Sequence, residues 1–293
     1  MKLKINFDFN KGIQRMFSNI LYIEFSIEMR CYMELLKNAP LNYSIQFLFD
    51  KEPLLENIIL LDELKKTFGN VDILFSTNTM ISFVFNDYSI NAEGIDIPMQ
   101  ILLIKESYEH SKKILNLVEY SQLTDNSINY INESKFLLVI SDFMATSIDY
   151  KKRIYIFNKI LKTLMPILPC KIVYWACSQK LINTIEFSDA LEKESDYSIY
   201  GIINVRYFIK DNFHVMDTIG LSSIGLPDLQ CSFDNIDPGI VSTILYEYGR
   251  KIFEHGDFLN DNEEINSMNL KFLCKHNYSD TNPKRIVIVL KPI

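Results

Sequence analysis

The strongest periodic pattern lies in the middle of the chain, over residues Tyr150–Leu164. Apolar side chains recur there every three or four positions, which is the spacing of one face of an α-helix. Asp149 is placed to cap the first turn, and Pro166 follows the last turn as a stop signal. The unbroken apolar run Phe136–Ile140 precedes the helix and is typical of a buried central strand. A sheet with a packed helix is therefore predicted here.

An earlier region shows the same mixture of short apolar runs and helical stripes. The predicted order of elements from residue 44 is β-α-β-β-β-α. The first helix follows strand Ser44–Phe49; it is opened by Pro53 and Glu56, and its apolar stripe is Ile59, Leu60, Leu64 and Phe68. The later elements are strands Val71–Ser76, Met80–Phe85 and Pro98–Lys105 and helix Tyr108–Tyr120. Gly69 follows the first helix, as a glycine that accepts positive φ does at a helix C-terminus.

The C-terminal part repeats this order of strands and helices. The predicted elements are strands Lys171–Trp175, Ile202–Ile209, His214–Asp217, Leu229–Phe233 and Ile286–Leu290, with a helix from Asp237-Pro238 to Glu254. We therefore predict an α+β protein of two sheet-plus-helix lobes, with the hypothesis that they are related ferredoxin-like halves. The polar stretch Thr124–Ser127 is the predicted boundary, which gives an N-terminal extension over residues 1–43, an N-terminal lobe over 44–125 and a C-terminal lobe over 126–293.

Charge and cysteine usage restrict the classes of partner and compartment. The formal net charge is −7 and the basic runs are short, which disfavours a nucleic-acid partner. The apolar stretch Ile20–Leu36 carries four charged residues, so it does not predict a membrane span. The five cysteines are scattered and form no CxxC pair, which indicates a reducing compartment. We expect a cytoplasmic protein that contacts neither nucleic acid nor membrane.

Familiar catalytic and metal-binding motifs are absent from the sequence. It has no GxGxxG, GxxxxGK[ST], HExxH or GxSxG pattern and no zinc-ligand spacing, so no cofactor or metal is predicted. Cys177 could form a dyad with a histidine only if the two met in space. Glu254, His255 and Asp257 are three potential metal ligands at the end of a helix. A simpler explanation is that the helix dipole favours His255 at the C-terminus and that Gly256 accepts positive φ there.

The segment from Asp217 to Gln230 is the most unusual in the chain. Gly220 and Gly225 frame a short apolar turn, and Asp228 then leads back into a strand. Buried carboxylates and amides need hydrogen-bond partners. One interpretation is a loop that presents backbone amides and carboxylates to a ligand. The other, which we favour, is a tight crossover whose aspartates cap its own backbone.

Four further residues complete the candidate binding set. Trp175 ends a predicted strand and could form either a pocket wall or the rim of the core. Asn204 and Arg206 lie on one predicted strand, where the arginine could make a bidentate contact to an anionic group. Asp142 follows the apolar run and could act with Asp217 or Asp228 as an acid or base.

Five ordered blocks resemble a known but uncharacterised family. They read LLVISDFMATSIDY from Leu137, PCKIVYWACSQKL from Pro169, NVRYF from Asn204, MDTIGLSSIGLPDLQCSF from Met216 and LYEYGRKIFEHGD from Leu245. In this order they resemble domain of unknown function 4261, over roughly residues 44–293 and most specifically over 136–260. The resemblance implies a bacterial cytoplasmic protein with the character of accessory domains beside toxin–immunity and defence genes. It implies no reaction.

Two classes of function follow from these observations. The leading hypothesis is a non-catalytic protein that binds another protein, as immunity or adaptor proteins do, because catalytic motifs are missing and aromatic residues are abundant. The alternative is a hydrolase or transferase with an Asp/Arg pocket in the C-terminal lobe. A structural subunit with a large homodimer interface is a third interpretation, and the oligomeric state is left open.

Overall fold

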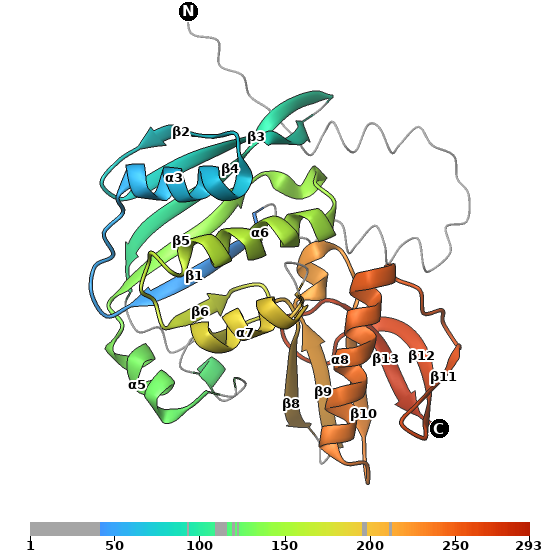
Figure 1. Ribbon diagram of the computed structural model, residues 1–293. Helices are drawn as coiled ribbons and strands as arrows, with labels where there is room; N and C mark the ends of the chain where they lie inside the picture. The colour runs from blue at the N-terminus through green and yellow to red at the C-terminus, as the bar shows by residue number, and fades with distance from the viewer. Residues whose placement is uncertain are drawn as a thin grey trace, which may run out of the picture.

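The protein is built on two antiparallel-rich sheets that lie next to each other, each with helices packed on it (Figure 1). The computed structural model describes residues 42–92, 94–108, 116–118, 121, 123–194, 198–210 and 213–293. Sheet A has seven strands in the order β2-β3-β4-β5-β1-β6-β7, and sheet B has six in the order β11-β12-β13-β10-β9-β8. The prediction of an α+β chain with two sheet lobes is confirmed, while the ferredoxin-like relation stays a prediction.

Sheet A is antiparallel at every junction. Its strands are β1 (Ser44–Phe49), β2 (Val71–Ser76), β3 (Met80–Ala92), β4 (Ile95–Ser107), β5 (Phe136–Phe143), β6 (Ile172–Trp175) and β7 (Lys180–Asn183). The first strand in the sequence is central in space, because β1 pairs with β5 on one side and with β6 on the other. This position explains why β1 is almost entirely buried, with apolar side chains on both faces.

Helices cover both faces of sheet A. They are α3 (Asn57–Phe68), α5 (Asp125–Glu133), α6 (Tyr150–Leu164) and α7 (Thr184–Glu194), with a short 3₁₀ turn η2 (Ala145–Ser147) before α6. Successive strand residues point to opposite faces, so Phe47 joins the core under α3, α6 and α7 while Leu48 joins a smaller cluster with α5. Asp149 caps α6 by accepting hydrogen bonds from two backbone amides of its first turn, as predicted.

Among the described residues, a single α-helix packs on one face of sheet B. Its strands are β8 (Asn204–Lys210), β9 (Phe213–Ile219), β10 (Asp228–Phe233), β11 (Glu264–Ser267), β12 (Leu270–Tyr278) and β13 (Ile286–Pro292), with the 3₁₀ turn η3 (Leu221–Ile224) and helix α8 (Pro238–His255). Figure 1 shows α8 in front of sheet B beside β9 and β10, and the helix contacts β8, β9 and β10. Asp237 caps α8 and Pro238 occupies its first position, as the sequence predicts. Only the β10–β13 junction is parallel.

One apolar core runs through both lobes. It contains residues of α3 and α6 on sheet A together with Leu245 of α8 and Leu290 of β13 on sheet B. Hydrogen bonds also cross the junction, since the Tyr150 hydroxyl donates to the Phe253 carbonyl at 2.8 Å. The two sheets therefore share buried apolar surface, which is the main stabilising contribution in folding.

Several predicted bounds differ from the observed ones. The predicted loop Thr124–Ser127 is instead the start of α5, because Thr124 caps that helix with its side chain. The predicted boundary between residues 125 and 126 lies within α5 and does not separate the two sheets, because β1 before it pairs with β5 after it in sheet A. The change of sheet falls between β7 and β8. Ile59 is also not in the α3 stripe, since it is exposed while Leu60, Leu64 and Phe68 are buried.

Some predicted elements fall on residues outside the described ranges. The extension over residues 1–43 lies outside the described residues except for its last two, and so does most of the predicted helix Tyr108–Tyr120. Among the helices that are described, none combines the length and the apolar character needed to cross a membrane.

The shared core predicts that the two lobes unfold together. Leu245→Ala, in α8, removes a fully buried side chain and should lower the free energy of unfolding by about 2–5 kcal/mol. Trp175 is the only tryptophan and is buried in sheet A, so its fluorescence reports on the other lobe. Urea unfolding followed by this fluorescence should shift as much as unfolding followed by circular dichroism. A tryptophan transition that does not move would contradict a shared core. The exposed Leu74→Ala is the control, with an expected change within ~0.5 kcal/mol.

Candidate functional site

The polar residues predicted for sheet B do come together in the structure. Arg206, Asp217 and Gln230 lie directly opposite one another on β8, β9 and β10, so their side chains form a row on one face of the sheet. Arg206 donates to both carboxylate oxygens of Asp217, with Nε–Oδ1 at 3.0 Å and Nη2–Oδ2 at 2.8 Å. This bidentate pairing is the strongest arrangement of an arginine with a carboxylate.

A second arginine, absent from the predicted set, completes the row. Arg285 precedes β13 and donates through Nη2 to Asp217 Oδ2 at 2.7 Å and through Nε to Asp228 Oδ2 at 3.1 Å. The same Nη2 also donates to the Thr218 carbonyl at 2.6 Å. Arg285 therefore bridges the two aspartates. The four side chains of Arg206, Asp217, Asp228 and Arg285 are called the charge cluster below.

Asp228 also organises the turn between β9 and β10. Its carboxylate accepts hydrogen bonds from the backbone amides of Leu221 and Ser222 at 3.1 and 3.2 Å, which cap the start of η3. It accepts a third from the Thr218 hydroxyl at 3.1 Å. The interpretation that the aspartate caps its own crossover accounts for every one of these contacts.

The two glycines of the segment serve the backbone of the same turn. Gly220 has φ +130°, and a Cβ at this position would lie 1.8 Å from the carbonyl oxygen of Ile202. Gly225 has φ +80° in the left-handed region and ends η3. Both positions require glycine for reasons of backbone geometry, independent of a ligand.

Gln230 and the loop before Arg285 cover the remaining part of the row. The Gln230 amide donates to Asp280 Oδ2 at 3.0 Å and its oxygen accepts from the Asp280 amide at 2.8 Å. The Thr281 hydroxyl donates to Asp217. Asp217 and Asp228 are fully buried, and the two arginines of the charge cluster are at most 5% exposed. The cluster is neutral, internally paired and shielded from solvent.

Asp142 belongs to a separate buried ion pair in sheet A. It accepts from Arg153 of α6 through Nε at 2.5 Å and Nη2 at 2.9 Å, and from the Tyr43 backbone amide at 2.7 Å. Arg153 also stacks over the Tyr43 ring, 5.6 Å from its centre. This pair fastens α6 to the sheet. Asp142 contacts a different arginine from the one that holds Asp217, so the predicted acids do not share one pocket.

The remaining candidates near the lobe junction are structural in their contacts. Trp175 is fully buried between Tyr43 and Phe187, at ring distances of 6.0 and 5.8 Å, so it lies within the core. The Asn204 amide donates to the Gln179 carbonyl at 3.3 Å and links the lobes. Cys177 is half-buried, and burial raises the pKa of its thiol, which disfavours a thiolate nucleophile.

Asp257 lies in a third arrangement, around a histidine. His276 of β12 contacts Asp257 through Nε2 at 3.0 Å and Asp261 through Nδ1 at 2.8 Å. Its hydrogen bond to Asp257 is the main cause that raises the pKa of His276 to about 9, although burial opposes the shift. For Asp261, burial raises the pKa, but the hydrogen bonds from His276 outweigh it and the pKa is lowered. A protonated His276 thus holds two carboxylates at once.

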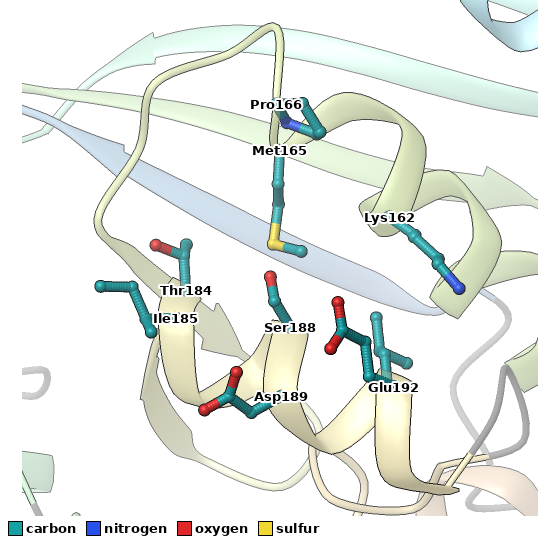
Figure 2. Close-up of a pocket in the computed structure, with 9 residues that line it drawn as sticks. Lys162, Met165, Pro166, Thr184, Ile185, Ser188, Asp189 and Glu192 are labelled. Atoms are coloured by element: carbon teal, nitrogen blue, oxygen red, sulfur yellow. The ribbon is translucent and has the colours of Figure 1, made fainter.

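A surface groove lies away from all of these groups. It is a cavity of about 400 Å³ between the end of α6 and the length of α7 (Figure 2). Its lining consists of Lys162, Met165, Pro166, Thr184, Ile185, Ser188, Asp189, Leu191 and Glu192. None of the ten residues predicted from the sequence is among them. The groove has no motif in the sequence, because it arises where two amphipathic helices meet over a small side chain.

Comparison with known proteins identifies part of sheet B. Residues 217–291 match the family model described as domain of unknown function DUF4261. The match covers about a quarter of the chain, and the matched residues are called the DUF4261 segment. No curated protein and no solved structure matches the chain. The matched range is shorter than the resemblance expected over residues 44–293, and it extends past residue 260, where that resemblance was expected to be less specific.

The DUF4261 segment includes most of the charge cluster. It contains Asp217, Asp228 and Arg285, so three of the four charges lie within the matched family range. Arg206 comes from β8, outside this range. In the part of the chain that the structure describes, no group of three or more histidine, cysteine or acidic side chains is placed to hold a metal ion.

The charge cluster predicts a large effect of removing one arginine. Arg285→Met leaves two buried carboxylates with one arginine fewer, so the free energy of unfolding should fall by about 3–5 kcal/mol. Arg250→Met is the matched control, because Arg250 pairs with Glu254 on the exposed side of α8 and should cost at most ~1 kcal/mol. Urea unfolding of both variants measures the difference. Equal losses would contradict the role assigned to the cluster.

The histidine of the DUF4261 segment predicts a pH dependence of stability. The pKa of His276 is raised from 6.5 to about 9 on folding, so its contribution is complete below pH 6.5 and is lost as the pH rises through about 9. His276→Gln should therefore lower the free energy of unfolding by about 1–3 kcal/mol near pH 6, where Asp257 and Asp261 are ionised, and the deficit should shrink toward zero above pH 9. Urea unfolding at a series of pH values tests this. A deficit independent of pH would show that the protonated histidine is not the stabilising form.

Proposed function

We propose that the chain is a bacterial, cytoplasmic protein without catalysis that binds another protein, in the manner of an immunity or adaptor protein. The observation that carries this proposal is the use of the charged candidates inside the fold. Arg206, Asp217 and Asp228 form their hydrogen bonds with each other, with Arg285 and with backbone groups. Side chains engaged in this way stabilise a scaffold and leave recognition to the surface.

The alternative of a hydrolase or transferase gains no support from the same geometry. Such an enzyme needs an acid or base within reach of a bound substrate, in a cavity that the substrate can enter. Asp142, Asp217 and Asp228 are fully buried, and the groove between α6 and α7 is lined by none of them. A substrate would have to displace buried ion pairs to reach these carboxylates, at a cost of several kcal/mol.

The surface that we assign to the partner is the groove and its rim. Substituting Trp175, Asp228 or Gln230 would test folding, because none of these side chains is accessible. Ile185, in contrast, stands at the rim of the groove with 70% of its surface exposed. An exposed apolar residue beside a hollow is the usual composition of an interface centre, where an apolar contact is surrounded by polar groups.

The proposal predicts that a charge at the groove rim weakens partner binding. Candidate partners are the proteins encoded by neighbouring genes, purified singly and titrated against the full chain by calorimetry. For a partner that binds, Ile185→Glu should raise Kd at least roughly tenfold, because it buries a carboxylate in an apolar contact.

The control for this experiment is Ile58→Glu. Ile58 is 76% exposed and occupies the same place in the first turn of α3 that Ile185 has in α7. Its substitution should leave Kd within about twofold. If no neighbouring gene product binds, the proposed class of partner is wrong. If Ile58→Glu weakens binding as much as Ile185→Glu, the proposed surface is wrong.

A further inference from the structure

The shape of the groove follows from the residues that α7 turns toward α6. Thr184, Ser188 and Glu192 recur every four positions and so lie along one line of the helix, facing the groove. Ser188 is small and half-buried at the centre of this line. In Figure 2 the Met165 side chain points from the end of α6 toward Ser188 and stops above it. The hollow is therefore the space that a larger residue at position 188 would fill.

Resting on the proposed function, we infer that this groove takes an apolar side chain of the partner with a lysine or arginine beside it. A cavity of about 400 Å³ is at the small end of binding pockets and suits a leucine or phenylalanine side chain with part of its backbone. Met165 and Ile185 supply the apolar contacts, and the buried Leu191 also lines the groove. Met is adaptable in shape, which suits a contact made and released at a surface.

Acidic side chains beside the groove favour a lysine or arginine on the partner. Asp189 and Glu192 are exposed on the groove side of α7, and neither forms an ion pair within the described residues. Lys162, on the opposite wall, already takes part in another interaction, whereas Asp189 and Glu192 place two negative charges at the rim of the groove. The Glu192 carboxylate rises toward the space between the helices (Figure 2). A cationic partner side chain at the rim would pair with these acids, while an anionic one would be repelled.

Helical peptides test this inference without knowledge of the natural partner. The probes are three short fluorescent peptides rich in alanine: one carries leucine and lysine on one face, one has glutamate in place of lysine, and one has alanine in place of leucine. Fluorescence anisotropy with the full chain measures each Kd at low and high salt. We expect the leucine–lysine peptide to bind at least roughly tenfold more tightly than either of the others, and its affinity to fall with salt.

Variants of the groove separate the two parts of the inference. Ser188→Leu fills the hollow and should abolish binding of the leucine–lysine peptide. Asp189→Asn with Glu192→Gln should weaken it roughly fivefold and remove most of the salt dependence. The control pair Glu56→Gln with Asp62→Asn neutralises one acid immediately before α3 and one on it, and should change neither quantity. Circular dichroism and the fluorescence of Trp175 confirm that each variant is folded.

The outcomes distinguish this inference from the proposed function. Equal binding of the lysine and glutamate peptides, or full binding to Ser188→Leu, overturns the partner chemistry inferred here. If a neighbouring gene product nevertheless binds and Ile185→Glu weakens it, the proposed function stands with a different partner chemistry. If the leucine–lysine peptide binds as expected but no neighbouring gene product does, the groove chemistry stands and the identity of the partner class is wrong.

Discussion

The arrangement of sheet B depends on a neutral set of buried charges. Arg206 and Arg285 share Asp217, and Arg285 also holds Asp228, so each charge is balanced only while the others are in place. Three of the residues come from β8, β9 and β10, and Arg285 immediately precedes β13. Together they fix these strands against one another, including the parallel pair β10–β13. A shift of register by one residue would move an unpaired charge to the other face, which is a far larger penalty than the loss of an apolar contact.

Elements with a strong local pattern could be predicted from the sequence, and those set by distant partners could not. Helix α6 was predicted with its bounds and its cap, because apolar spacing and Asp149 are local signals. Strands β11 and β12 were not predicted, because polar residues interrupt the apolar ones in their sequences. They become strands through pairing with each other and, for β12, with β13. The central place of β1 between β5 and β6 likewise results from long-range pairing.

The same division applies to the candidate site. Asp217, Asp228 and Gln230 could be singled out because polar groups among apolar neighbours must find partners, and the structure shows those partners. Arg285 was missed because it lies 68 residues from Asp217 in the sequence. Together with Lys284 it forms a short basic run, which gives no indication of a buried partner. The groove was missed for another reason. Its residues are ordinary members of two helices, and only the packing of α6 against α7 makes a hollow over Ser188.

The internal neutrality of the fold determines what a partner meets. Arg153, Arg206 and Arg285 cancel Asp142, Asp217 and Asp228, so the formal net charge of −7 is carried entirely by the rest of the chain. Exposed charges act over about 8 Å at physiological salt, so a partner at the groove responds mainly to the acids of α7 beside it. The buried ion pairs are therefore assigned to the scaffold. Under the proposed function, selectivity for a partner would rest on the acids at the rim of the groove together with the exposed Ile185.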